Sequence, residues 1–255
     1  MRQVKTNALY SRSFQERWRT NLEPNYRLVV TFPINLTANL HLPKVEIGIN
    51  MTTNSPELHS AAFEGDLAKV RELIEAGANP NSTGDCGSGT LLNFHPKVTS
   101  YLLANGAPPD TQTNENGASV LAGLCYVNQI QCVKLLLEHG ANPDLGHRDT
   151  LETPMHHAIA NDASAELIAL LIAHNANVNT KTKPGIYSYN YYGDTPTRGE
   201  TALHRASAYA PIETVKLLLD AGADRNTTDI NGNTPYQWAG WHRREKDLVQ
   251  LLASA

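Results

Sequence analysis

Histidine is the residue type in this chain with the widest chemical scope, because imidazole binds metals and exchanges protons near neutral pH. Two of the ten histidines are adjacent, His156 and His157. Others that could join them are spread along the chain: His59, His147, His204 and His242. Metal sites recur with ligand spacings such as H-E-x-x-H or C-x-x-C, and neither spacing occurs here. We therefore expect no metal centre and no cofactor.

The three cysteines give a weak catalytic signal. Cys86 lies in the loop sequence GDCGSG (84–89), and the nearest histidine that could activate it is His95. The same loop lacks the GK[ST] ending of a phosphate-binding loop and has no strand before it. An odd number of cysteines at irregular positions argues against a disulfide framework and fits a reducing compartment. The sequence thus favours a cytoplasmic protein that is not an enzyme and has no small-molecule substrate.

Tyrosine is concentrated in one short segment, IYSYNYYG (186–193). Four of the ten tyrosines of the chain fall there: Tyr187, Tyr189, Tyr191 and Tyr192. No apolar periodicity runs through this segment, and proline and glycine bracket it, so it does not read as core. Tyrosine offers a large, rigid contact area at low entropic cost. We favour contact with a partner over the alternative, in which the tyrosines fold back and staple the segment onto its own domain.

Composition narrows the class of partner. The net charge is −4 and the pI about 6.2, which does not favour nucleic acid. Residues 1–54 carry seven basic and three acidic residues, or +4, so residues 55–255 carry −8. No apolar run approaches the length of a membrane span, and the first residues lack the apolar core of a signal peptide. A soluble protein is the expected partner, not a membrane.

Internal repetition identifies the elements that must position these residues. One phrase ends five segments, namely EAGANPN (75–81), ANGAPPD (104–110), EHGANPD (138–144), AHNANVN (173–179) and DAGADRN (220–226). A leucine-rich helical patch precedes each phrase. The glycine or asparagine within the phrase stands at the end of that helix, where a residue in the left-handed conformation commonly caps it. These capping positions are spaced 29, 34, 35 and 47 residues apart.

A second phrase recurs upstream, as SPELHSAA (55–62), ETPMHHAI (152–159), ETALHRAS (200–207) and NTPYQWAG (233–240). Together the two phrases resemble the ankyrin repeat, a unit of about 33 residues with a T-P-L-H-x-A signature. The resemblance covers residues 55–255, within an expected repeat domain of 51–255, and we divide it into six units: 55–81, 82–110, 111–144, 145–179, 180–226 and 227–255. It implies an all-α solenoid of stacked helix pairs with projecting β-turns.

Two units depart from the repeat. The second reads GTLLNFHPKVTSYLL (89–103) and leaves no room for a full first helix before Pro96. The fifth is about fourteen residues longer than the usual unit, and the excess falls within 181–198. The tyrosine-rich segment therefore belongs to an insertion at the turn between the fourth and fifth units.

The resemblance also assigns roles to several residues. It implies that His59, His156 and His204 are structural, each tying neighbouring turns together through backbone hydrogen bonds. It places Cys125 and Cys132 in the core. In ankyrin folds the projecting turns and the inner helices form a concave surface on which partners dock. We expect the binding residues there, in the insertion and along the inner helices: Tyr187, Tyr189, Tyr191, Tyr192, Arg198, Tyr209, Trp241, His242, Tyr126 and Asn161.

Residues 1–50 lie outside the repeat. An apolar residue recurs at every fourth position from Tyr10 to Leu22, which predicts an amphipathic helix, and alternation over 28–42 predicts a strand or hairpin. This extension could cap the repeats or meet a membrane. Alternatively, Met51 is the natural start and residues 1–50 are an over-extended reading frame.

Three functions follow from these observations. The first is a monomeric, non-catalytic module that binds one partner protein through its concave face and the insertion. The second is an inhibitor or immunity factor that inserts the 181–198 loop into the cleft of an enzyme. The third is an adaptor that docks on a membrane through residues 1–50 and recruits cargo with its repeats.

Overall fold

The computed structural model describes residues 54–84, 87–112, 117–162, 164–188 and 196–253. All of them belong to the second of two units into which the chain divides, Ile49–Ala255. The helix and strands expected within residues 1–50 lie outside the described residues, as do Cys86, Tyr189, Tyr191 and Tyr192.

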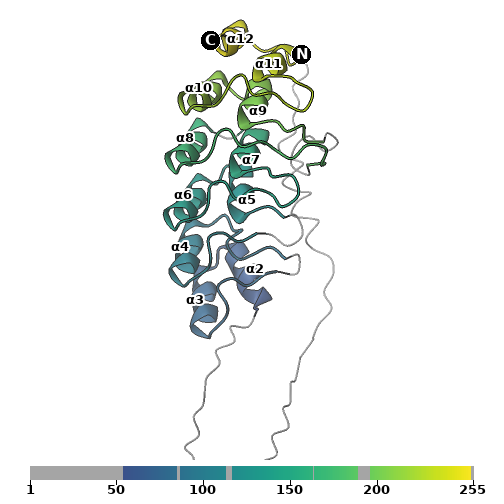
Figure 1. Ribbon diagram of the computed structural model, residues 1–255. Helices are drawn as coiled ribbons and strands as arrows, with labels where there is room; N and C mark the ends of the chain where they lie inside the picture. The colour runs from purple at the N-terminus through teal and green to yellow at the C-terminus, as the bar shows by residue number, and fades with distance from the viewer. Residues whose placement is uncertain (1–53, 85–86, 113–116, 163, 189–195, 254–255) are drawn as a thin grey trace, which may run out of the picture. The chain divides into compact units, whose positions relative to one another are not determined.

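Helices in this unit occupy two columns (Figure 1). The inner column consists of α2 (Pro56–Glu64), α5 (Val120–Tyr126), α7 (Pro154–Ala160), α9 (Ala202–Tyr209) and α11 (Pro235–Trp241). The outer helices are α3 (Leu67–Glu75), α4 (Pro96–Ala104), α6 (Ile130–Glu138), α8 (Ala165–Ala173), α10 (Ile212–Asp220) and α12 (Lys246–Ala253). The turns between successive units project on the side of the inner column. The expected solenoid of helix pairs is thus confirmed.

The inner helices begin with a recurring cap. Thr153, Thr201 and Thr234 each stand just before α7, α9 and α11 and form a capping box with the residue three positions later. In α7 and α9 that residue is the histidine of the repeated phrase. Each cap satisfies backbone N–H groups that a helix start leaves unpaired, which explains why the phrase marks the start of a helix.

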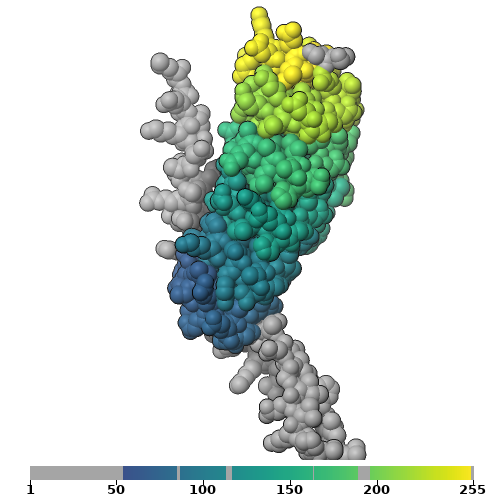
Figure 2. Space-filling view, turned by 90° about the vertical axis from the view of Figure 1, so that its left-hand side faces the viewer, coloured from purple at the N-terminus to yellow at the C-terminus, as the bar shows by residue number. Residues whose placement is uncertain are grey.

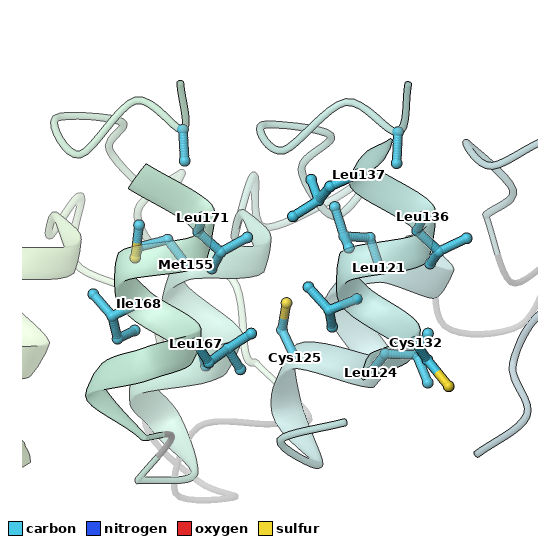
Figure 3. Packing of buried hydrophobic residues seen from close by; sticks show 14 of the residues in the cluster. Leu121, Leu124, Cys125, Cys132, Leu136, Leu137, Met155, Leu167, Ile168 and Leu171 are labelled. Atoms are coloured by element: carbon cyan, nitrogen blue, oxygen red, sulfur yellow. The ribbon is translucent and has the colours of Figure 1, made fainter. Parts of the chain in front are cut away.

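Apolar side chains between the columns form one continuous core. Figure 3 shows Met155 with the leucines of α8 on one side and Leu121 with the residues of α6 on the other. Cys125 and Cys132 lie in this core and are fully buried, as expected. The two cysteines are unpaired, and burial raises the pKa of the Cys125 thiol, which disfavours the reactive thiolate form.

The second unit contributes one helix, α4, to the described residues. Residues 87–95 replace the missing inner helix with turns. Buried Asn93 holds them: its side-chain amide donates to the Thr90 carbonyl, and its carbonyl oxygen accepts from the Thr99 hydroxyl. The outer side of the stack nevertheless forms a continuous surface past this unit (Figure 2).

Candidate protein-binding site

The insertion begins as a narrow antiparallel ribbon. Lys181 pairs with Thr201 and Tyr187 with Pro196 in isolated β-bridges. Between them the Thr182 N–H donates to the Glu200 carbonyl at 3.0 Å. The insertion therefore extends the projecting turn between units four and five, where the repeat spacing placed it.

A cluster of buried charges lies beneath this ribbon. Arg205 of α9 is fully buried, and its guanidinium contacts two carboxylates that are 1 % exposed, Glu152 and Glu200. Nη2 of Arg205 lies 2.6 Å from Oε1 of Glu152 and 2.6 Å from Oε1 of Glu200. Glu152 precedes α7 and Glu200 precedes α9, so the cluster joins unit four to unit five. Moving charged groups out of water costs free energy, and further hydrogen bonds to the two carboxylates offset part of that cost.

Hydroxyl groups complete the cluster and connect it to the insertion. The Ser188 hydroxyl donates to Oε1 of Glu152 at 2.9 Å, and the Thr182 hydroxyl donates to Oε2 of Glu200 at 2.8 Å. Ser188 is 2 % exposed, whereas its neighbour Tyr187 is 63 % exposed. Because side chains alternate along an extended segment, the buried serine sets the outward direction of the tyrosine. The described part of the insertion is therefore anchored at its base, and Tyr187 is presented to solvent.

Burial and charge shift several pKa values in this cluster. Burial raises the pKa of Glu152, but Arg205 and the hydrogen bonds from Ser188 and Thr150 outweigh it and hold that pKa at about 2. Burial, with Arg205 adding to it, lowers the pKa of His156 to about 3. Burial also lowers the pKa of His157 to about 4. At neutral pH the carboxylates are charged and both histidines are neutral.

The second part of the site lies at the C-terminal end of the inner column of helices, around α9 and α11. Tyr209 at the end of α9 and His242 after α11 stack edge to face with their ring centroids 4.5 Å apart. The Tyr209 hydroxyl lies 3.3 Å from Nε2 of His242. Tyr209 is 37 % exposed and Trp241 is 55 % exposed. Arg198, at the end of the insertion, places its guanidinium carbon 5.9 Å from the ring centroid of buried Trp238.

Tyr126 is the last residue of α5 in the third unit, and Asn161 directly follows α7 in the fourth unit. The Asn161 amide donates to the Tyr126 carbonyl at 2.7 Å, which links these units along the inner column. Asn161 is exposed and Tyr126 is half-buried. The residues that we expect to bind a partner lie at the ends of successive inner helices, and Trp241 is the most exposed of Tyr126, Tyr209 and Trp241.

The three structural histidines differ in what they contact. His204 joins neighbouring turns: Nδ1 bonds its own cap residue Thr201, and Nε2 lies 3.0 Å from the Asn233 carbonyl of the next unit. His59 reaches the next unit through the Ser88 hydroxyl, which lies 3.0 Å from its Nε2. His156 bonds its cap residue Thr153, but its buried Nε2 has no partner among the described residues.

Sequence reasoning missed the charged cluster. Its signal was present in the repeated phrases, because ETPMHHAI and ETALHRAS both put glutamate before the cap threonine, where NTPYQWAG has asparagine. The position after the helical histidine holds His157 and then Arg205. Within the described ranges no group of three or more potential ligand residues could hold a metal ion. No helix among those residues has both the length and the apolar character needed to cross a membrane.

Comparison with known proteins agrees with the repeat architecture. Residues 88–182 and 187–255 match the family described as ankyrin repeats (3 copies), and residues 57–85 match the ankyrin repeat. The B-cell lymphoma 3 protein homolog of Mus musculus is 27% identical over 243 residues, covering 92% of this chain and 49% of the relative. A putative ankyrin repeat protein of Rickettsia bellii is 32% identical over 141 residues, covering 55% of this chain and 69% of the relative. The chain spans about half or less of the first curated relatives it matches.

A similar fold occurs in the solved structure of a predatory endopeptidase from Bdellovibrio bacteriovorus in complex with an immunity protein. The match has a TM-score of 0.64 at 24% identity and covers 79% of this chain and 98% of the matched chain. At that identity the likeness concerns the fold.

Proposed function

This chain belongs to the ankyrin-repeat family, and on that premise we propose that it is a non-catalytic module that binds a partner protein through its inner, concave face and its insertion. Proteins of this family serve protein–protein interaction. The observation that carries the proposal is the exposed side chain of Tyr187 next to a buried polar anchor. Ser188 and the Arg205 cluster fix the base of the insertion, and Tyr187 stands in solvent beside them.

The energetics favour recognition over self-stapling for the described part of the insertion. A tyrosine that stapled the insertion would bury its ring, whereas Tyr187 is 63 % exposed. The anchoring is done by Ser188, a small residue with little apolar surface to bury. Rigid aromatic side chains on a fixed support lose little entropy on binding and are frequent binding hot spots. Tyr189, Tyr191 and Tyr192 stay proposed contacts on sequence grounds.

The test is capture of partner proteins by the immobilised full-length chain, identified by mass spectrometry. A genuine partner should be retained at least about tenfold less well, or about 1.4 kcal/mol weaker, by the variants Tyr187→Ala and Tyr209→Ala. Tyr236→Ala is the matched control, because Tyr236 is a comparably exposed tyrosine, 44 %, that lies outside the proposed column. Equal retention by all three variants would contradict the proposed face.

A second candidate is an inhibitor or immunity factor that inserts the 181–198 loop into the cleft of a partner enzyme. The anchored ribbon favours it, since a finger that enters a cleft must keep its direction. The similar fold beside an endopeptidase is a precedent for such a partner in another protein. If this candidate is right, the captured partner is an enzyme whose turnover falls on addition of the chain. Replacing 189–194 by a Gly-Ser turn should restore that turnover.

A further inference from the structure

The C-terminal end of the inner face is cationic although its domain is acidic. Residues 55–255 contain 14 basic and 22 acidic residues, or −8. Yet three arginines surround His242. Arg243 and Arg244 follow it in the sequence, and the charges of Arg244 and Arg198 act on its ring. Among the described residues, the charged groups that act on the His242 ring are two arginines, Arg244 and Arg198. The acidic Glu245 is exposed and pairs with Arg244 at 3.3 Å.

Arg198 is the arginine of this group whose side chain lies against an aromatic ring and, among the described residues, keeps its side-chain N–H donors available for an anionic group. The Arg244 guanidinium already donates hydrogen bonds to the end of α9. Its Nη2 donates to the Ala210 carbonyl at 2.5 Å, and its Nη1 donates to the Ser207 carbonyl at 3.2 Å. The Arg198 side chain rests against the Trp238 ring and donates no hydrogen bond to the residues that the structure describes. A guanidinium has five N–H donors in a fork that matches a carboxylate. This side chain is held in place while its donors stay available.

We propose that this patch, composed of Arg198, Tyr209, Trp241 and His242, binds an acidic segment of the partner protein, with carboxylates on Arg198 and His242 and apolar side chains on Tyr209 and Trp241. The inference rests on the proposed function and specifies the chemistry of the partner. Charge complementarity supports it, because a cationic face on a domain of charge −8 attracts an anionic segment where the rest of the surface repels it.

His242 gives the interaction a pH dependence. Burial, then Arg244 and Arg198, lower the pKa of His242, so the ring is neutral at neutral pH. The groups that face it are Tyr209 from α9, Arg198 from the insertion and Arg244 from the turn after α11. A docked carboxylate adds an opposite charge and favours the protonated ring, so binding takes up a proton. Affinity for an acidic segment should therefore rise as the pH falls from neutral to mildly acidic, where glutamate stays ionised.

The probe is a fluorescent synthetic peptide of alternating glutamate and leucine, with a glutamine-for-glutamate counterpart as the neutral control. Binding to the full-length chain is followed by fluorescence anisotropy. The acidic peptide should bind more tightly than the neutral one, and added salt should weaken it. Arg198→Gln should weaken binding about threefold to fivefold, whereas Arg198→Lys should keep most of it. Lys216→Gln on α10 removes the same charge from the outer column and should have no effect.

Several outcomes would overturn this inference. One is equal binding of the neutral peptide, which leaves the proposed concave face intact but removes its preference for acid. Another is equal loss with Lys216→Gln, which shows a general charge effect, and a third is no binding of either peptide. Binding of an oligothymidylate at least as tightly as the acidic peptide would point to phosphate and not to protein. His242→Asn should flatten the pH dependence, and an unchanged dependence rejects the role of His242.

Discussion

The paired histidines of α7 show how burial decides the chemistry of a residue. Burial lowers the pKa of His156 to about 3 and that of His157 to about 4, from an ordinary value of 6.5. Such rings are poor proton-transfer groups at neutral pH, and neither belongs to a metal-binding group among the described residues. Both rings are buried on α7 and stay neutral at neutral pH.

These two histidines predict acid sensitivity. Below pH 6.5 the unfolded chain binds protons that the folded rings refuse until about pH 4 to 3, so the free energy of unfolding should fall over that window. Each pH unit costs up to about 1.4 kcal/mol per histidine. The depressed pKa of Glu152 adds stability that is complete above pH 4.5 and is lost towards pH 2, so it does not oppose this fall. Urea unfolding between about pH 8 and about pH 4 measures the slope.

His157→Gln is the matched variant, because it keeps a polar side chain of similar size without titration. Its slope of stability against pH should be shallower than that of the unmodified chain. An identical slope would mean that His157 does not contribute.

Leu151 adopts a left-handed backbone conformation, which is unfavourable for leucine. It has φ of 58°, and the residues two positions before the neighbouring cap threonines are glycines, Gly199 with φ of 70° and Gly232 with φ of 79°. A left-handed conformation costs a leucine about 1–2 kcal/mol, and Leu151 is 47 % exposed, so it recovers little by burial. Leu151→Gly should therefore stabilise the chain by up to about 1 kcal/mol, measured by thermal or urea unfolding.

The converse variant checks the same argument. Gly232→Leu places a side chain in the left-handed position with nothing within 4 Å of its Cβ, so backbone strain alone should destabilise the chain. If Leu151→Gly instead destabilises, the exposed leucine makes contacts that compensate for its conformation.

At the scale of elements, the insertion combines two roles that sequence could not separate. Its base is structural, because Ser188 and Thr182 complete the buried carboxylates. Tyr187 is available for contact. Replacing residues 183–194 by a short Gly-Ser turn removes Ser188 and leaves Glu152 with one hydrogen bond fewer, which should cost about 1–3 kcal/mol of stability. Our sequence-based interpretation as an exposed loop would have made the same replacement nearly neutral.

A smaller replacement separates the roles. Substituting Gly-Ser for 189–194 keeps Ser188, so the melting temperature should change little while partner binding falls. Ser188→Ala should do the opposite and lower stability with less effect on contact residues. The prediction fails if both replacements melt like the unmodified chain.

The second unit lacks an inner helix among the described residues, yet its neighbours still stack on it. No inner helix stands between α2 and α5 in the described residues, yet Leu91 and Asn93 are buried there and α4 still packs on α3 and α6. Apolar contact and satisfied backbone groups are what neighbouring units require of each other, and turns can supply both.

For the whole molecule, we predict that residues 51–255 fold by themselves. The continuous core begins at Leu58 and runs to Leu252 within the described residues, and Ser55 already caps α2. A chain that begins at Met51 should melt close to the full-length protein in calorimetry. A loss of more than about 3 kcal/mol would show that residues 1–50 contribute to the first unit.

Much of the architecture could be predicted because repeat proteins are built from local signals. Cap threonines, left-handed helix ends and leucine patches act within a few residues, so their spacing alone located the units, the missing inner helix and the insertion. The helix-end column with Tyr209 and His242 followed from the same register.

The contact between units four and five depends on residues that lie far apart in the sequence. Glu152, Ser188, Glu200 and Arg205 are separated by up to 53 residues, and no local pattern says that they share one buried site. Buried charges must find partners wherever the fold brings them, because solvation is lost there. Because Ser188 and Thr182 donate to the buried carboxylates, the described part of the insertion is an anchored ribbon and not a free loop, and Tyr187 is exposed on it. No periodicity in the sequence predicts this arrangement.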